Sequence, residues 1–218
     1  GKGRVVVTSS PDGRRLAQPQ VVMDLPFHIS YPSVFEHSGR IFMLPETLQN
    51  RSVTLYEAHD FPRDWRPIAT LLDDCKASDP TLFHHEGRWW LFVSMAEPSW
   101  TSINDELFLF SSESLTAGEW KPHPMNPVVS DVRGARCAGN ILRHEGKIYR
   151  FAQDCSSRYG AGIVAKEIIR LNEFAYEEAE VTEITPAWNR NYRGIHTINY
   201  IPGLSVADAL RLRWKRRI

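Results

Sequence analysis

Short runs of alternating apolar and polar residues recur along this chain, and a glycine turn interrupts each run. One copy reads TLFHHEGRWWLF (residues 81–92): an apolar strand, a turn at Gly87 and a second strand rich in aromatic residues. Period-two alternation on both sides of a tight turn predicts a β-hairpin. The turn glycines of the four copies are Gly39, Gly87, Gly146 and Gly203, spaced by 48, 59 and 57 residues. Repeats of this length are typical of the blades of a β-propeller.

A second, outer pair of strands follows each of the first three hairpins, as in residues 52–65 and 106–120. We therefore expect an all-β fold, a β-propeller of four-stranded antiparallel blades that forms a single domain over residues 1–218. The expected blades cover about 31–72, 79–130 and 138–186. An outer hairpin at 3–23 and an inner hairpin at 195–210 would combine into a composite closing blade, giving four blades. The alternative is a truncated five-bladed parent, and the sequence does not decide between the two.

The charge balance and the cysteine pattern argue against several kinds of partner and site. The chain has 26 Lys plus Arg and 26 Asp plus Glu, so no net field would attract nucleic acid. Its three cysteines form no CxxC pair, which argues against a disulfide framework or zinc site and favours a reducing, cytoplasmic location. No apolar run approaches the ~20 residues that span a bilayer. We expect no nucleic-acid partner, no membrane span and no cofactor.

No metal is expected either, because no set of oxygen ligands is evident from the spacing of the acidic residues. The chain begins with Gly1 rather than with methionine, so we expect it to be a fragment or a trimmed domain.

The blade openings carry a family resemblance. The motif SDP, followed by an apolar strand, a glycine turn and an aromatic strand, resembles the five-bladed propellers of arabinanase, β-xylosidase and levansucrase-type glycosidases. The series LPFHISYPSVFEHSGRIFMLPET, DPTLFHHEGRWWLF, PHPMNPVVSDVRGARCAG, AQDCSSRYG and GIHTIN is similar to the propeller domain in the N-terminal part of plant glucosamine inositolphosphorylceramide transferases. This similarity covers about residues 1–208. Bacterial relatives of that domain stand beside formyltransferase-like or glycosyltransferase-like modules in surface-glycan biosynthesis, which implies a bacterial source and a transferase module in the same or a neighbouring chain.

In a propeller, the first strand of every blade lines the central channel. The residue that opens this strand lies at one mouth of the channel, where binding and catalytic residues gather. The glycosidase resemblance implies three acids there: a base or nucleophile, a pKa-tuning Asp and a proton-donating Glu. In this chain the base position falls on Tyr31, the tuning position on Asp79, and the acid position near Arg136. Two of the three acids are missing, so the resemblance does not carry the hydrolytic machinery over.

Other polar residues are expected to converge on the same mouth. Glu46 and Asp154 end the second strands of the first and third blades, and with Asp79 they are the candidate catalytic acids. The candidate substrate-binding residues are Tyr31, Arg136, Tyr159, Arg193, His196 and Trp100. A planar guanidinium grips carboxylates and phosphates bidentately, and an aromatic ring can stack on a sugar.

Each of these residues also has a structural interpretation. Asp79 could cap the turn before Pro80, and Glu46 could be a solvated surface acid. Arg136 could be an ion-pair partner between blades, and His196 a hydrogen-bonded core histidine.

Three functions therefore remain open. The first is a carbohydrate-recognising propeller module in surface-glycan or glycolipid biosynthesis, with a saccharide or sugar-phosphate ligand. The second is an active glycoside hydrolase or sugar-transferring enzyme that uses Asp79 with Glu46 or Asp154. The third is a protein-interaction scaffold.

Overall fold

The computed structural model describes residues 1–96 and 102–211. In this part of the chain the structure consists of strands and connecting loops, with one turn of 3-10 helix at Leu48–Asn50. Every strand pair is antiparallel. The expected all-β, antiparallel fold is confirmed. Across the described ranges, no helix has the length and apolar character needed to cross a membrane.

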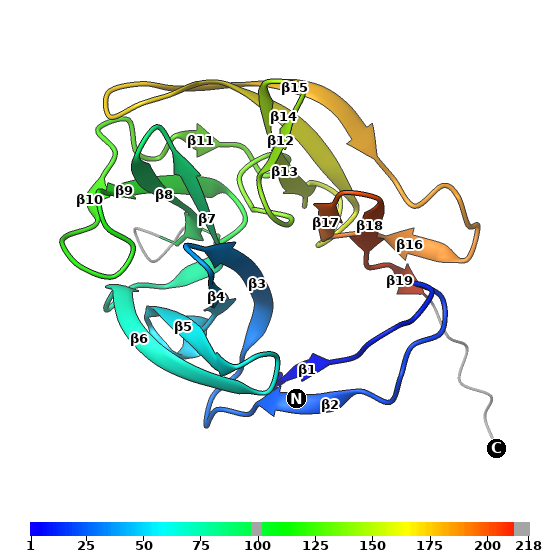
Figure 1. Ribbon diagram of the computed structural model, residues 1–218. Coiled ribbons are helices and arrows are strands. Elements are labelled where there is room, and N and C mark those ends of the chain that lie inside the picture. The colour runs from blue at the N-terminus through cyan, green and yellow to red at the C-terminus, as the bar shows by residue number, and fades with distance from the viewer. Residues whose placement is uncertain (97–101, 212–218) are drawn as a thin grey trace.

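Three sheets form the body of the molecule, and each follows the order of its strands in the chain. The first contains β3 (Ser30–His37), β4 (Arg40–Glu46), β5 (Val53–Asp60) and β6 (Asp64–Leu72). The second contains β7 (Ala77–His85), β8 (Arg88–Met95), β9 (Glu106–Ser112) and β10 (Lys121–Pro122), and β11 (Val129–Ser130) also pairs with β9. The third contains β12 (Leu142–His144), β13 (Lys147–Asp154), β14 (Gly162–Leu171) and β15 (Tyr176–Ile184). The sheets are arranged around a common centre, with β3 and β7 near it and β6 and β15 at the rim (Figure 1).

The hairpin turns set an identical register in the three sheets. Each turn has two residues, and both have positive φ: Ser38–Gly39, Glu86–Gly87 and Glu145–Gly146. This is the conformation of a type I′ turn, whose twist matches that of the flanking strands and whose second position favours glycine. Counting from the glycine therefore places equivalent residues of different sheets at equivalent heights along the channel.

The hydrophobic core lies between neighbouring sheets rather than inside any one of them. The first cluster joins the first two sheets and includes Phe42, Leu44, Leu55, Trp89, Leu91 and Val93. The second joins the second and third sheets and includes Phe83, Trp90, Phe92, Leu107, Leu109, Ile148 and Tyr176. Trp89 and Trp90 are adjacent on β8 and serve different clusters, because successive side chains of a strand point to opposite faces. The sheets therefore pack face to face, as blades do.

The two ends of the described chain form short sheets. β1 (Val5–Val7) pairs with β2 (Gln20–Met23), β16 (Tyr192–Gly194) with β19 (Leu210–Arg211), and β17 (Ile198–Ile201) with β18 (Leu204–Ala207). Within the described residues, β1–β2 and β17–β18 are separate two-stranded sheets. The composite closing blade and the number of blades are therefore not confirmed and stay predictions.

Candidate functional site

The opening residues of the first two sheets share an unusual backbone conformation. Tyr31 and Asp79 have φ of 46° and 47°, and each precedes a proline inside a bulge of its hairpin. A left-handed conformation at a residue other than glycine costs about 1–3 kcal/mol, which surrounding contacts must offset. For Tyr31 these contacts are at its hydroxyl, which lies 3.0 Å from Thr81 Oγ1 and accepts the Gly139 N–H at 2.7 Å. The Tyr31 hydroxyl thus links β3 to β7 and to the loop that precedes β12.

The Asp79 side chain is buried in an ion pair with Arg136. Asp79 is 3% exposed, and its Oδ2 accepts a hydrogen bond of 2.5 Å from Arg136 Nε. Arg136 Nη2 lies 3.6 Å from Glu46 Oε2, and Arg136 Nη1 donates to Asn104 Oδ1 at 2.9 Å. The guanidinium therefore lies between two carboxylates. It comes from the loop before β12, whereas Glu46 ends β4 and Asp79 lies in β7, so the cluster draws on all three sheets.

Neutral donors complete the hydrogen bonding of the two acids. Glu46 Oε2 accepts from Ser78 Oγ at 2.5 Å and from the Asp79 backbone N–H at 3.0 Å, and its Oε1 accepts from Ser30 Oγ at 3.2 Å. Gln153 Nε2 donates to Asp79 Oδ2 at 2.7 Å. These bonds fix both carboxylates in place beside the guanidinium.

The environment separates the pKa values of the two acids. Burial raises the pKa of Asp79 to about 6, although the Arg136 charge opposes the shift. Burial also acts to raise the pKa of Glu46, but the Ser78 hydrogen bond and the Arg136 charge outweigh it, so that pKa is lowered. Burial disfavours the charged form of Arg136, yet the Asp79 carboxylate raises its pKa overall. Near neutral pH, all three groups are therefore mainly ionised.

A second arginine anchors the loop that carries Arg136. Arg150 in β13 is fully buried, and its guanidinium makes two hydrogen bonds to Glu178, at 2.7 and 2.9 Å. Its Nη2 also donates to the Gly134 carbonyl at 2.7 Å, and its Nη1 to the Ala135 carbonyl at 3.4 Å. The position of Arg136 thus depends on a charged pair deep in the third sheet.

A cavity of about 220 Å³ opens beside the Asp79–Arg136 pair. Its walls are Ser30, Tyr31, Pro32, Asp79, Arg136, Tyr159, His196 and Thr197. The Arg136 guanidinium lies 5.0 Å from the centre of the Tyr159 ring, and that ring lies edge-on to the His196 ring at 5.2 Å. The cavity therefore offers carboxylate, guanidinium, imidazole and phenol groups within one small space.

Asp208 orients His196 at the edge of the cavity. Asp208 Oδ1 accepts the backbone N–H groups of His196 and Thr197, at 2.9 and 2.8 Å, and the Thr197 hydroxyl at 3.2 Å. Its Oδ2 forms an ion-pair contact with His196 Nδ1. Burial opposes the charge of Asp208, but the hydrogen bonds from His196 lower the pKa of this acid to about 2. Because Asp208 engages Nδ1, the ring nitrogen left for a ligand is Nε2.

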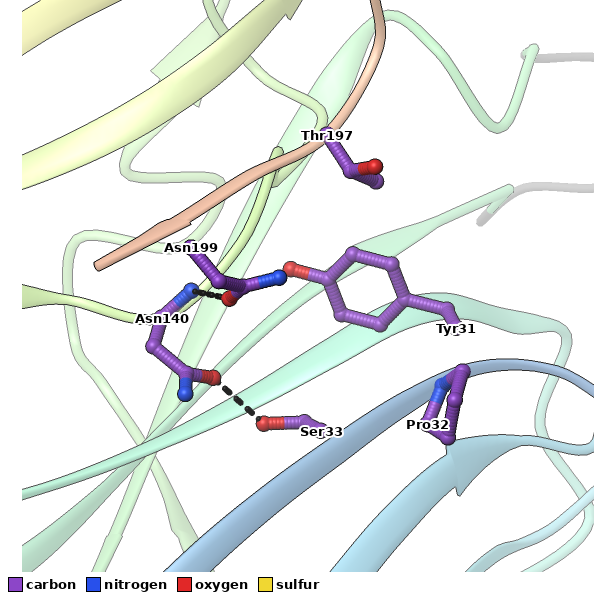
Figure 2. A pocket seen from close by; sticks show the side chains of 6 residues that line it. All are labelled: Tyr31, Pro32, Ser33, Asn140, Thr197 and Asn199. Atoms are coloured by element: carbon purple, nitrogen blue, oxygen red, sulfur yellow. Dashed lines mark hydrogen bonds between the residues drawn. The ribbon is translucent and has the colours of Figure 1, made fainter. Parts of the chain in front are cut away.

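A second cavity, of about 130 Å³, is lined by Tyr31, Pro32, Ser33, Asn140, Thr197 and Asn199. It shares Tyr31, Pro32 and Thr197 with the first cavity. Figure 2 shows the Ser33 hydroxyl donating to Asn140 Oδ1 (2.8 Å) and the Asn140 backbone N–H donating to Asn199 Oδ1 (2.9 Å). Ser33, Asn140 and Thr197 are each the third residue of the repeat, so the repeat presents an uncharged polar group at this depth in three copies. We refer to this space as the channel cavity.

Five of the residues proposed from the sequence line the first cavity: Tyr31, Asp79, Arg136, Tyr159 and His196. Glu46 joins them indirectly, behind the Arg136 guanidinium. Arg193 does not join them, because its side chain is exposed and donates to the Arg190 carbonyl at 3.5 Å. Trp100 lies outside the described residues. The functional roles of all these residues stay predictions.

The structure places Asp154 away from the other two candidate acids. Its carboxylate accepts from Ser156 and lies 3.7 Å from Arg133, and it lines a different cavity. The register explains this, because Glu46, Ser94 and Gln153 each lie seven residues after their turn glycine. Asp154 is one residue further on and therefore points to the opposite face. The position equivalent to Glu46 belongs to Gln153, which a count from the turn would have identified.

Three other contributors were missed by sequence reasoning. Asn104 lies in a loop between β8 and β9, and Ser78 immediately precedes Asp79; neither has a sequence signal beyond its neighbourhood. Asp208 follows the weakest copy of the repeat and reaches His196 only through the fold. No group of three or more His, Cys, Asp or Glu side chains arranged to hold a metal ion is present among residues 1–96 and 102–211.

Comparison with known proteins relates the chain to a family of transferases. Residues 1–198 match the family described as glucosamine inositolphosphorylceramide transferase 1, N-terminal. Glucosamine inositolphosphorylceramide transferase 1 of Arabidopsis thaliana is 36% identical over 163 residues, covering 74% of this chain and 21% of the relative. The enzyme of the same name from Oryza sativa subsp. japonica is 34% identical over 163 residues, covering 74% of this chain and 22% of the relative. The chain thus spans about a fifth of these relatives. They are plant proteins, which contradicts the expected bacterial source.

Several solved structures with the same fold are glycoside hydrolases of low sequence identity. A family 117 glycoside hydrolase of Zobellia galactanivorans has a TM-score of 0.61 at 13% identity, covering 84% of this chain and 56% of that chain. An exo-β-1,3-galactanase from Clostridium thermocellum has a TM-score of 0.61 at 16% identity, covering 82% of this chain and 42% of that chain. At these identities the likeness establishes the propeller-type fold alone. Taken with the match over residues 1–198, the sequence places this chain in the family of glucosamine inositolphosphorylceramide transferase 1 N-terminal domains.

Proposed function

We propose that this chain is a carbohydrate-recognising domain that holds a saccharide for a transferase module of glycolipid synthesis. The observation that carries the proposal is the cavity beside the Asp79–Arg136 pair, whose polar groups come from several sheets and are fixed by buried hydrogen bonds. The family supports the biosynthetic setting, because the curated relatives are named as transferases and are about five times as long as the matched segment. The remainder of such a protein would supply the transfer chemistry.

The size and chemistry of the cavity suit one sugar unit. An apolar cavity of about 150 Å³ holds a benzene ring, and pockets for drug-sized ligands begin at about 300 Å³. A space of about 220 Å³ is therefore suited to a single ring with its hydroxyl groups. Arg136 supplies donors and Asp79 an acceptor, the pairing that adjacent sugar hydroxyls require. The half-exposed Tyr159 ring adds an apolar face at the entrance.

We further propose that the site binds without hydrolysing. At the mouth, the glycosidase resemblance assigns the base position to Tyr31 and the acid position to the neighbourhood of Arg136, and neither residue is a carboxylic acid. Asp79 Oδ2 is already engaged by Arg136 and Gln153, which limits its use as a nucleophile. Both features support binding in place of cleavage.

Calorimetric titration with methyl glycosides of glucose, galactose and mannose, and with myo-inositol, tests the binding proposal. At least one compound is expected to bind to the wild type, and Arg136→Gln is expected to weaken that binding by ~10-fold or more, since a hydrogen bond to a charged group contributes about 1.5–3 kcal/mol. Arg193→Gln is the matched control, because Arg193 occupies the equivalent place before the last hairpin but is exposed. Loss of Arg136 without effect on binding would place the ligand elsewhere.

Catalysis by this domain is the second candidate function. It is favoured by the Asp79 carboxyl in the cavity, whose pKa of about 6 suits proton transfer near neutral pH. Release of p-nitrophenol from p-nitrophenyl glycosides measures this activity directly. A rate that Asp79→Asn abolishes while the fold is retained would establish a hydrolase and overturn the non-hydrolytic proposal.

A further inference from the structure

The charges around the cavity are unbalanced. Asp79 and Glu46 contact the Arg136 guanidinium from two sides, and Asp208 lies behind His196. One carboxylate, that of Asp79, thus lines the space, and two more lie directly behind its wall, against one guanidinium. The imidazole reduces the imbalance only when it is protonated, and the Asp208 charge then faces it directly.

The guanidinium has little capacity left for a further anion. Arg136 Nε is bonded to Asp79 Oδ2, Nη1 to Asn104 Oδ1, and Nη2 faces Glu46 Oε2 at 3.6 Å. A guanidinium has five N–H donors, so donors remain for a hydroxyl oxygen. A bidentate grip on a phosphate or carboxylate, however, needs two parallel donors from one edge of the group. A grip along the Nε–Nη2 edge would displace Asp79 and leave that carboxylate buried and unpaired, which is costly. A grip along the Nη1–Nη2 edge would displace Asn104 and bring the anion close to the Glu46 carboxylate.

Among the described residues, no Lys or Arg side chain other than that of Arg136 lines either cavity. Arg133 forms ion pairs with Glu183 and Asp154, and Lys166 with Glu180. Arg193 is exposed and bonded to a backbone carbonyl. None of these side chains lines either cavity. An anionic substituent would therefore meet no free positive charge in the described part of the site.

The channel cavity extends the site without adding charge. Its lining consists of hydroxyl, amide, phenol and proline groups (Figure 2). Such groups can replace the water around a sugar hydroxyl, but they cannot compensate a buried negative charge. A substituent that passes from the first cavity into the channel at Tyr31 and Thr197 must therefore be uncharged.

We propose that this site selects an uncharged sugar or cyclitol unit and rejects the same ring when it carries a phosphate or carboxylate. The inference rests on the proposed carbohydrate-binding function and narrows its ligand class. A hydroxyl group donates to the Asp79 carboxylate or to His196 Nε2 and accepts from Arg136. A phosphate adds about −1.5 to −2 charges at neutral pH and is repelled by the surrounding carboxylates.

Matched pairs of ligands that differ only in charge test this selection. The pairs are glucose with glucose 6-phosphate, glucose with glucuronate, and myo-inositol with inositol 1-phosphate, titrated calorimetrically into the wild type at one pH and ionic strength. The neutral member of at least one pair is expected to bind 10-fold or more tightly than its charged partner. Equal or tighter binding of the charged members overturns the inference and leaves the carbohydrate-binding function standing. Binding of no compound overturns both.

Variants that remove a negative charge identify which carboxylates cause the discrimination against charged ligands. Glu46→Gln and Asp208→Asn are expected to narrow the gap between neutral and phosphorylated ligands several-fold, because each removes a negative charge beside the cavity. Asp154→Asn is the matched control, since Asp154 lines a different cavity, and the gap should stay as in the wild type. Should either test variant fail to fold, the salt dependence of the wild type replaces it, because added salt screens repulsion and should narrow the same gap. A gap that changes in none of these measurements refutes the inference.

Discussion

The Arg136 guanidinium is the group whose removal should disturb this protein most. Asp79 and Glu46 are 3% and 8% exposed, and both contact the guanidinium. In Arg136→Ala the two carboxylates would remain buried side by side without a cation. Hydrogen bonds from Ser78, Gln153 and the Asp79 backbone would persist, but they carry no positive charge.

The loss of unfolding free energy expected for Arg136→Ala is large compared with the total stability of a domain. Breaking a buried pair by removing one partner costs about 3–5 kcal/mol. A typical domain has a free energy of unfolding of about 5–15 kcal/mol. With a denaturant slope of about 3 kcal/mol per molar urea, the unfolding midpoint should fall by about 1–2 M.

The stability lost in Arg136→Ala should also depend on pH, and the ionisation of Asp79 determines whether it grows or shrinks as the pH rises. The folded-state pKa of Asp79 is about 6, above its ordinary value of 3.8, so the folded protein holds this proton more tightly than the unfolded chain. Without Arg136 the folded-state pKa should rise further, because the main opposing charge is gone. Below that new pKa the variant takes up a proton and avoids part of the penalty. Its deficit relative to wild type should therefore be full at pH 8.5 and smaller at pH 5.5.

Urea titrations monitored by tryptophan fluorescence at the two pH values measure both effects. Arg193→Ala is the control, since it removes an exposed arginine at the equivalent place and should change the free energy of unfolding by no more than about 0.5 kcal/mol. A deficit in Arg136→Ala that is the same at pH 5.5 and pH 8.5 would refute the charge argument and indicate lost packing instead. If this variant does not fold, Arg136→Gln offers a smaller perturbation with the same expected sign.

Three further predictions concern the surroundings of the site. Tyr159→Ala should weaken sugar binding by up to about 30-fold in calorimetric titration, because the ring holds the Arg136 guanidinium through a cation–π contact of about 0.5–2 kcal/mol, whereas Tyr159→Phe should bind as the wild type does. Equal loss in both variants would implicate the hydroxyl. Arg150→Ala should lower the free energy of unfolding by about 3–5 kcal/mol in urea, and a neutral result would mean that Glu178 finds another partner. Gly139→Ala should lower the melting temperature by several degrees, because its Cβ would lie 1.9 Å from the Ile198 carbonyl oxygen. An unchanged melting temperature would show that the backbone at Ile198 can move away from the new methyl group.

The local features of the fold could be predicted because short-range chemistry determines them. The hairpins at Gly39, Gly87 and Gly146 are recognisable in the sequence from the alternation of apolar and polar residues and from turns that need positive φ. Whether the hairpins β1–β2 and β17–β18 combine into one blade depends on contacts between distant segments, for which the sequence carries no signal, and in the described residues they are separate sheets. The closing blade was therefore an extrapolation from the repeat.

The residues of the candidate site could be predicted where the repeat determines the position of a residue along the channel. Tyr31 and Asp79 lie near the start of their strands, and the repeat alone predicts that they face the same space, which the shared cavity bears out. Asp154 was misplaced by a single residue, which in a strand reverses the direction of the side chain. Asp208 could not be found at all, since its role depends on how the last hairpin folds back onto His196.

The bulges at the strand openings give this architecture room to change. In the first two hairpins the opening residue and its proline stand outside the regular hydrogen-bond ladder. Exchanging the side chain there leaves the interstrand bonds on either side intact, so a new group can be introduced at the rim of the hollow without rebuilding the sheet. This position holds a tyrosine in one copy of the hairpin and an aspartate in the next. A repeated scaffold can thus vary the groups that contact a ligand while its fold stays the same.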